Sequence, residues 1–155
     1  MTRKHIPSLI SLTVLAACSA SHDEVILCTN TVENYAALRD NPETAESYAD
    51  LFTDQGTFTL GGSQTAGREA LIARHKASHE SAKWQHEMGK ISVHKQGPDK
   101  ITGSSQVTVK TGPKGVAEYE RTIAATYDDT FVMENGSCRI KSRLVTVISD
   151  ETVNN

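Results

Sequence analysis

The stretch SYADLFTDQGTFTLGGSQTAGREALIAR, residues 47–74, decides the fold predicted for this chain. Its order of residue types indicates the end of a helix, a turn at residues 54–56, a short strand pair and the start of another helix. The β-branched and aromatic residues 57–60 form the first strand, a Gly61-Gly62 turn follows, and residues 64–66 return antiparallel. Gly67 then opens a helix over residues 68–79. This helix needs a sheet to cover, and only the C-terminal half can supply one.

Two further helices are predicted before this stretch. Apolar residues recur at helical spacing from Val25 through Cys28, Val32 and Tyr35, which predicts an amphipathic helix that ends near Arg39. Asn41-Pro42 is a typical helix start, with Asn as the N-cap and Pro at the first helical position. The second helix would run to Phe52, with Phe52 on its apolar face.

The rest of the chain is predicted to be sheet. Strands are expected over residues 84–94, 101–110, 119–133 and 138–148, and the clearest alternation of apolar and polar residues lies in 101–110. A loop is expected at 111–115, and Asn135-Gly136 is a favoured hairpin turn. Three helices followed by long antiparallel strands predict an α+β fold with the helices packed on one face of the sheet.

The N-terminus is predicted to be a lipoprotein signal. Basic residues precede a short apolar run, which ends in Leu15-Ala-Ala-Cys18. This tetrapeptide resembles the lipobox of bacterial lipoproteins, in which the cysteine is acylated; the alternative is an ordinary cleaved signal with a chance cysteine. The predicted division is a signal over 1–17, a tether over 18–24, a domain over 25–149 and a tail over 150–155. Ser19 after the cysteine favours the outer membrane, facing the periplasm.

The charge of the mature chain argues against nucleic acid as a partner. Removal of the signal would leave fourteen Lys and Arg against nineteen Asp and Glu, a net charge near −5 with His neutral. An acidic domain without a basic stripe lacks the usual means of binding phosphates. Any membrane attachment would therefore depend on acyl chains at Cys18.

Cys28 and Cys138 leave two alternatives open. An exported domain permits a disulfide between them. Each also fits as a small buried residue, because Cys28 lies on an apolar helical stripe and Cys138 opens a strand.

The landmarks of residues 47–74 resemble those of a known family. The chain resembles the SnoaL-like group of the nuclear transport factor 2-like superfamily in the order of three features: Tyr48-Ala-Asp-Leu-Phe-Thr-Asp-Gln-Gly-Thr-Phe, then Gly67-Arg-Glu-Ala-Leu, then a four-stranded meander. The resemblance covers roughly residues 25–147. It implies a cone-shaped barrel with an apolar pocket. A homodimer is also expected. Family members include polyketide cyclases, ketosteroid isomerases, dehydratase-like lyases and domains that only bind or assemble, so the fold does not settle the function.

The resemblance directs attention to the pocket residues. Enzymes of the family abstract a proton next to a carbonyl or eliminate water, using a tuned base and a facing donor and no metal. His86 stands where the dehydratase branch has its first pocket histidine; the alternative is a histidine on the solvent side of a curved strand. Tyr127 and Asp129 point the same way along one strand. These three are the candidate catalytic residues; the candidate ligand-binding residues are Tyr35, Tyr48, Trp84 and Phe131.

The expected partner of the histidine is missing from its usual place. The dehydratase pattern places an Asp on the first helix soon after the tyrosine, where this chain has Ala36, Ala37, Leu38 and Arg39. Asp40 comes late, and we interpret it as a turn residue. A second pocket histidine is also missing from the strand that begins at Ile101.

No metal or cofactor site is predicted. His75 and His79 have the four-residue spacing of two metal ligands on a helix, but no acidic residue or third ligand accompanies them. We therefore expect half-buried histidines with satisfied hydrogen bonds.

Two hypotheses of function remain. The first is an envelope lipoprotein whose pocket binds a small apolar or aromatic molecule, with lyase- or isomerase-type acid–base chemistry left open. The second is a non-catalytic interaction or dimerisation module. A cavity of a few hundred Å³ lined by His86 and a carboxylate would favour the first, and an exposed apolar sheet face over a small pocket the second.

Overall fold

The computed structural model describes residues 15–152 and, within them, the side chains from His22 onward. Residues 1–14 of the predicted signal and the side chain of Cys18 lie outside this part. The elements are α1 (Leu15–Asp40), a 3₁₀ turn η1 (Pro42–Thr44), α2 (Ala45–Ala49), β1 (Phe52–Leu60), β2 (Ser63–Ala66), α3 (Arg68–Ser81), β3 (Ala82–Lys95), β4 (Ile101–Pro113), β5 (Arg121–Glu134) and β6 (Ser137–Thr152).

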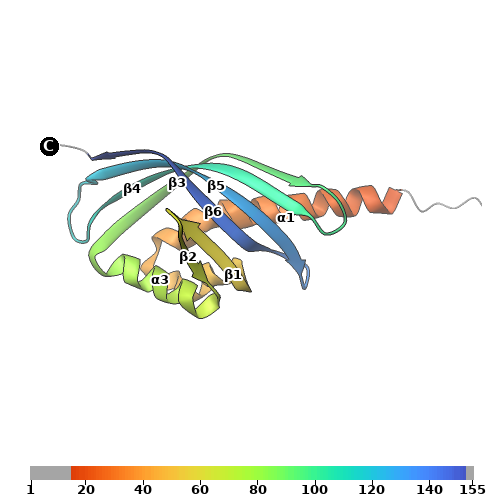
Figure 1. Cartoon of the computed structure of the whole chain (residues 1–155), viewed down its shortest axis with the longest axis horizontal. Coiled ribbons are helices and arrows are strands. Elements are labelled where there is room, and N and C mark those ends of the chain that lie inside the picture. The colour runs from red at the N-terminus through yellow and green to blue at the C-terminus, as the bar shows by residue number, and fades with distance from the viewer. Residues whose placement is uncertain (1–14, 153–155) are drawn as a thin grey trace, which may run out of the picture.

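The predicted α+β fold is confirmed. Six strands form one sheet in the order β2-β1-β6-β5-β4-β3, in which all neighbours are antiparallel except β1 and β6. The sheet curves over α1 and α3, which lie on its concave side (Figure 1). The Asn135-Gly136 turn joins β5 to β6 with positive φ at both residues, as the predicted hairpin requires.

The first helix is longer than predicted. It begins at Leu15 rather than Val25, so the residues predicted as a mobile tether are helical. The segment contains Ala, Leu and Glu but no Gly or Pro, and nothing in it stops a helix. Glu24 pairs with Lys95 of β3 at 2.5 Å, which ties this part of α1 to the sheet. No helix of the described part is long and apolar enough to span a bilayer.

The end of the second helix was predicted wrongly. Helix α2 ends at Ala49, and Phe52 begins β1, so residues 54–56 belong to a strand and not to a turn. The reason is tertiary: Phe52 pairs with Ile140 of β6, and the backbone N–H of Ile140 donates to the carbonyl of Leu51 at 2.8 Å. The predicted turn instead becomes a shift in strand register between Phe52 and Thr57.

Gly56 lies inside this irregular segment, and its backbone passes close to its neighbours. A Cβ atom at this position would lie 2.8 Å from Cβ of Phe52 and 2.9 Å from the carbonyl oxygen of Thr53. The close approach, rather than a turn, explains the glycine. At the other end of the chain, β6 continues to Thr152 and takes in the first residues of the predicted tail.

Cys28 and Cys138 form a disulfide that joins α1 to β6. Of the two alternatives, the structure therefore has the bridge. The hydroxyl of Thr31 donates to the carbonyl of Cys138 at 2.9 Å and makes a second link between the same elements. Both cysteines are buried in the core.

Candidate functional site

A cavity of about 350 Å³ lies between α1 and the concave face of the sheet. Its wall combines aromatic and aliphatic side chains with a few charged ones. The lining residues come from α1, β1, α3, β3, β4, β5 and β6, and are Tyr35, Arg39, Phe58, Leu60, Arg74, Trp84, His86, Val109, Arg121, Ile123, Ala125, Tyr127, Val145, Val147 and Asp150. A mostly apolar cavity of this size with a few convergent polar groups is typical of a small-molecule site.

His86 on β3 is held by Asp40, the last residue of α1. The imidazole Nδ1 donates to Oδ1 of Asp40 at 2.5 Å, and the backbone N–H of His86 donates to Oδ2 at 2.6 Å. Because a carboxylate only accepts, this contact places the proton on Nδ1. Nε2 then carries the lone pair, and it has no hydrogen-bond partner among the described residues.

Burial keeps this imidazole neutral. The side chain of His86 is only 5% exposed. Desolvation lowers the pKa of His86 below its ordinary value, against the opposing effect of Asp40. At neutral pH, His86 is therefore a neutral base whose free nitrogen belongs to the cavity wall.

Tyr35 packs against this base, and Tyr127 packs against Tyr35. The ring of Tyr35 meets the rings of His86 and Tyr127 edge-on, with centroids 5.9 and 5.5 Å apart. Burial raises the pKa of the Tyr127 phenol well above its ordinary value, so the hydroxyl stays protonated and can donate a hydrogen bond. A neutral base and a protonated phenol thus line the same cavity.

Asp129 has a different environment from the one predicted for a catalytic carboxylate. It accepts two hydrogen bonds from Arg143, at 2.8 Å from Nε and 2.7 Å from Nη2, and both side chains are buried. The guanidinium of Arg143 lies over the rings of Tyr35 and Tyr127, at 4.1 and 4.4 Å. Burial alone would lower the pKa of Arg143, but Asp129 raises it above the usual value. The ion pair thus packs against the rings of Tyr35 and Tyr127 and helps to hold them in position.

The structure brings together four of the seven predicted pocket residues. His86, Tyr127, Tyr35 and Trp84 line the cavity. Tyr48 and Phe131 are core residues outside its lining; Tyr48 packs against Tyr35 with ring centroids 5.6 Å apart. Tyr127 and Asp129 do share the concave face of β5, as predicted.

Asp40 is the residue that the sequence prediction missed. It was interpreted as a turn residue, but it lies in the last turn of α1 and supplies the carboxylate that holds His86. The signal that could have found it is the helical spacing of Val25, Cys28, Val32 and Tyr35. One further turn of the same helix after Tyr35 brings Arg39 and Asp40 to the side of the helix that faces the sheet.

His75 and His79 are buried, and each is bound to the end of α1. Nε2 of His75 lies 3.1 Å from the carbonyl of Leu38, and Nε2 of His79 lies 2.9 Å from the carbonyl oxygen and 3.0 Å from Nη1 of Arg39. Nδ1 of His75 is buried without a hydrogen-bond partner among the described residues, so the expectation of satisfied hydrogen bonds is wrong for this atom. Among residues 22–152, no group of three or more His, Cys, Asp or Glu side chains could hold a metal ion.

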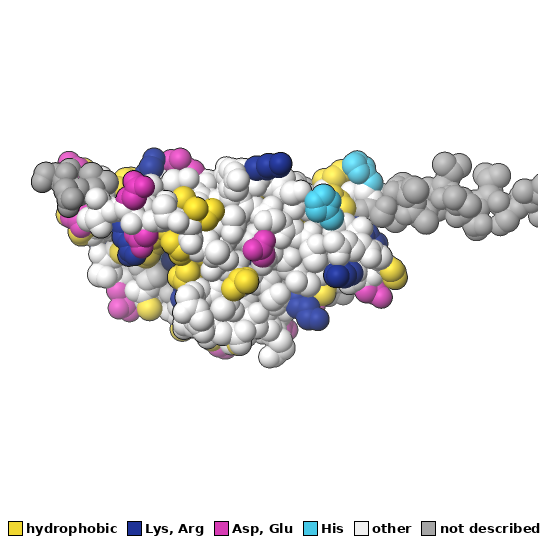
Figure 2. All heavy atoms as spheres, turned by 45° about the horizontal axis from the view of Figure 1, so that its top comes forward, with side chains coloured by type: hydrophobic (Ala, Val, Ile, Leu, Met, Phe, Trp, Pro, Cys, Tyr) yellow, Lys and Arg dark blue, Asp and Glu magenta, His cyan; other side chains and the backbone are white. Residues whose placement is uncertain are grey.

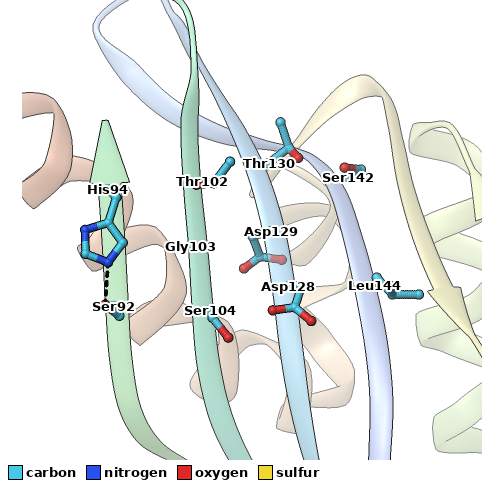
Figure 3. A pocket seen from close by; sticks show the side chains of 10 residues that line it. All are labelled: Ser92, His94, Thr102, Gly103, Ser104, Asp128, Asp129, Thr130, Ser142 and Leu144. Carbon is cyan, nitrogen blue, oxygen red and sulfur yellow. Dashed lines mark hydrogen bonds between the residues drawn. The ribbon is translucent and has the colours of Figure 1, made fainter. Parts of the chain in front are cut away.

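A second hollow, of about 470 Å³, lies on the outer face of the sheet over β3–β6. Figure 3 shows that short Ser and Thr side chains surround Asp128 there, while His94 bonds to Ser92 at 2.9 Å. Figure 2 shows this outer face mostly white, the colour of the backbone and of side chains that are neither charged nor hydrophobic, with few charged or hydrophobic side chains. The hollow lacks the aromatic wall and the buried base of the inner cavity, which is the better candidate site. The homodimer stays a prediction.

Comparisons with known proteins agree with this architecture. A family model described as "SnoaL-like domain" matches residues 27–144. A protein of unknown function from Mycobacterium tuberculosis is similar in structure, with a TM-score of 0.75 and 22% identity over 86% of this chain and 77% of that one. A candidate scytalone dehydratase from Novosphingobium aromaticivorans has a TM-score of 0.74 and 15% identity over 91% of this chain and 93% of that one.

A third solved structure comes from the same organism. It is a nuclear transport factor 2-like protein with a cystatin-like fold, with a TM-score of 0.69 and 22% identity over 91% of this chain and 92% of that one. Among curated protein sequences, none matches this chain. At these identities the structural matches establish the fold.

Proposed function

Since this chain belongs to the SnoaL-like domain family, as the match over residues 27–144 shows, we propose that its inner cavity binds a small aromatic or alicyclic molecule and acts on it by acid–base chemistry. The observation that carries the proposal is the contact between Nδ1 of His86 and Asp40 at 2.5 Å. It orients a neutral imidazole whose other nitrogen is left for a ligand. A carboxylate in this position is the usual support of a histidine base.

The reaction class follows from the two groups that face the cavity. Nε2 of His86 would take a proton from a carbon next to a carbonyl, and a hydrogen bond from the hydroxyl of Tyr127 or Tyr35 would stabilise the oxyanion that develops. The imidazolium would then return its proton, either to another carbon, which is an isomerisation, or to a departing hydroxyl, which is a dehydration. The candidate scytalone dehydratase among the similar structures favours the second outcome.

The first test replaces the base. His86→Ala is expected to abolish the thermal stabilisation that any aromatic ligand found by screening gives to the wild-type protein. Differential scanning fluorimetry measures the shift, and His94→Ala, on the outer face, is the matched control. If the ligand raises the melting temperature of His86→Ala as much as that of the wild type, His86 does not take part in ligand binding.

The catalytic part has a separate readout. For a ligand with a C–H next to a carbonyl, the wild type should exchange that hydrogen with D₂O, followed by NMR. Asp40→Asn should slow the exchange by about 10²–10⁴-fold, the range that general acid–base catalysis contributes. If Asp40→Asn binds the ligand normally and exchanges the hydrogen at the wild-type rate, the proposed role of the His86–Asp40 pair would be contradicted.

We also propose that the chain is a lipoprotein anchored to the bacterial envelope, facing the periplasm. The support is the Leu15-Ala-Ala-Cys18 sequence after an apolar run. Cys18→Ser should move the protein from the membrane fraction to the soluble fraction of cells that express the full chain. Unchanged fractionation would exclude acylation at Cys18 as the anchor.

A further inference from the structure

Two arginines on the wall of the inner cavity have no acidic partner. In the described part of the chain, Arg68, Arg121, Arg139 and Arg143 each form an ion pair with a carboxylate. Arg39 and Arg74 form none, and both line the cavity. The unpaired guanidinium groups are therefore concentrated at the site and not scattered over the surface.

Arg39 is the more unusual of the two because it is buried, with only 6% of its surface exposed. Its Nη1 lies 3.0 Å from Nε2 of His79, a nitrogen that is also 2.9 Å from the carbonyl oxygen of Arg39, and its guanidinium lies 5.1 Å from the centre of the Trp84 ring. Both neighbours hold the group in place without neutralising it. A buried charge is costly unless it is paired, so a residue in this position calls for an anion.

Arg74 lies on α3, and its guanidinium stacks on Phe58 of β1 at 4.3 Å. Stacking on a ring fixes the plane of a guanidinium and leaves the N–H groups on its edge free to donate. Arg39 and Arg74 therefore both offer oriented donors in an otherwise apolar cavity.

The charge of the cavity is opposite to the charge of the protein. The whole chain has a formal net charge of −3. At the cavity, Arg121 is neutralised by Asp150, and the carboxylate of Asp40 lies behind a neutral His86. Three guanidinium groups against these two carboxylates leave a net charge of +1. An acidic protein with a positive, aromatic cavity is arranged to select a negatively charged ligand.

We propose that the ligand of this cavity is a singly charged aromatic acid whose oxyanion is bound by Arg39 and Arg74. The inference rests on the proposed function, that the cavity binds a small molecule, and adds the chemical class of that molecule. The aromatic body packs among Tyr35, Trp84 and Tyr127. The planar guanidinium groups hold the oxyanion through charge-assisted hydrogen bonds, which are stronger than neutral ones.

The experiment compares acids with their neutral amides on the intact folded protein. Probes are benzoate and cinnamate against benzamide and cinnamamide, with benzenesulfonate and phenyl phosphate as further oxyanions. Calorimetry gives the affinities. Trp84 is the chain's one tryptophan and lines the cavity, so its fluorescence reports that binding occurs there. Each acid should bind roughly tenfold to a hundredfold more tightly than its amide.

Variants assign this preference to the two arginines. Arg39→Gln and Arg74→Gln should each reduce the preference for acid over amide, and Arg39→Lys should retain part of it. Arg68→Gln is the matched control, because Arg68 lies on the same helix as Arg74 but pairs with Asp50 outside the cavity. If Arg39→Gln does not fold, Arg74→Gln decides alone.

Each other outcome counts against the inference. Amides that bind as tightly as the acids, or a preference that survives in the folded Gln variants, would overturn it and leave the cavity a ligand site. If phenyl phosphate, a dianion near neutral pH, binds more tightly than the monoanionic probes, the proposal that the ligand carries a single charge would be wrong. Failure of every probe to bind the wild type would count against the ligand site as well.

Discussion

Replacement of Asp129 by Asn is expected to lower the free energy of unfolding by about 3–5 kcal/mol, the usual result of removing one member of a buried ion pair. The side chains of Arg143 and Asp129 are 0% and 1% exposed, so the guanidinium would lose its counter-charge without gaining water. Nη1 of Arg143 already lacks a hydrogen-bond partner among the described residues. Equilibrium denaturation in urea at pH 7 measures the change.

Two further variants test whether charge is the cause. Asp129→Leu combined with Arg143→Met removes both charges and keeps an unbranched side chain between Tyr35 and Tyr127, so most of the lost stability should return. Lys76→Gln breaks the exposed pair with Glu46 and should leave the midpoint unchanged. A double variant as unstable as Asp129→Asn would show that packing, and not the unpaired charge, causes the loss.

The strands of the C-terminal half could be predicted because their signals are local. Alternating residues from Ile101 onward and the Asn135-Gly136 turn specify extended chain and a hairpin without reference to the rest of the molecule. The boundary at Phe52 could not be predicted in this way. It depends on Ile140, which lies far along the chain and pairs with Phe52 across a parallel junction of β1 and β6.

The site was predictable in part for the same reason. His86 could be placed by its position on a strand, but its partner Asp40 lies 46 residues earlier, at the end of a helix. Only the packing of α1 on β3 shows that the end of this helix reaches His86. The role of Asp129 likewise depended on a residue outside its own strand, because Arg143 on β6 decides whether that carboxylate is free.

The unpaired arginines at the cavity carry no signal in the sequence at all. Arg39 and Arg74 have ordinary positions on helices, and whether a surface carboxylate reaches them depends on how α1 and α3 lie on the sheet. The net charge of the whole chain is negative, whereas the charged groups at the cavity sum to a positive charge. The chemical class of the ligand therefore has to be inferred from the folded structure and cannot be predicted from composition.

Reduction of the disulfide, or its removal by Cys28→Ala with Cys138→Ala, is expected to destabilise the fold by about 4–5 kcal/mol. The bridge joins residues 110 positions apart, so its loss frees nearly the whole domain in the unfolded state. It also connects α1 to β6, and α1 carries Asp40 and Arg39 into the site. Thermal and urea denaturation, with and without dithiothreitol, measure the effect.

The double alanine variant supplies the control for the reductant. Because the chain has three cysteines, the variant retains only Cys18, and dithiothreitol should not lower its stability further. Wild-type protein in dithiothreitol should approach the stability of the variant. If the reduced wild type is as stable as the oxidised form, the bridge does not stabilise the domain. If stability is lost as expected, the fold is suited to an oxidising compartment, which agrees with the export proposed from Cys18.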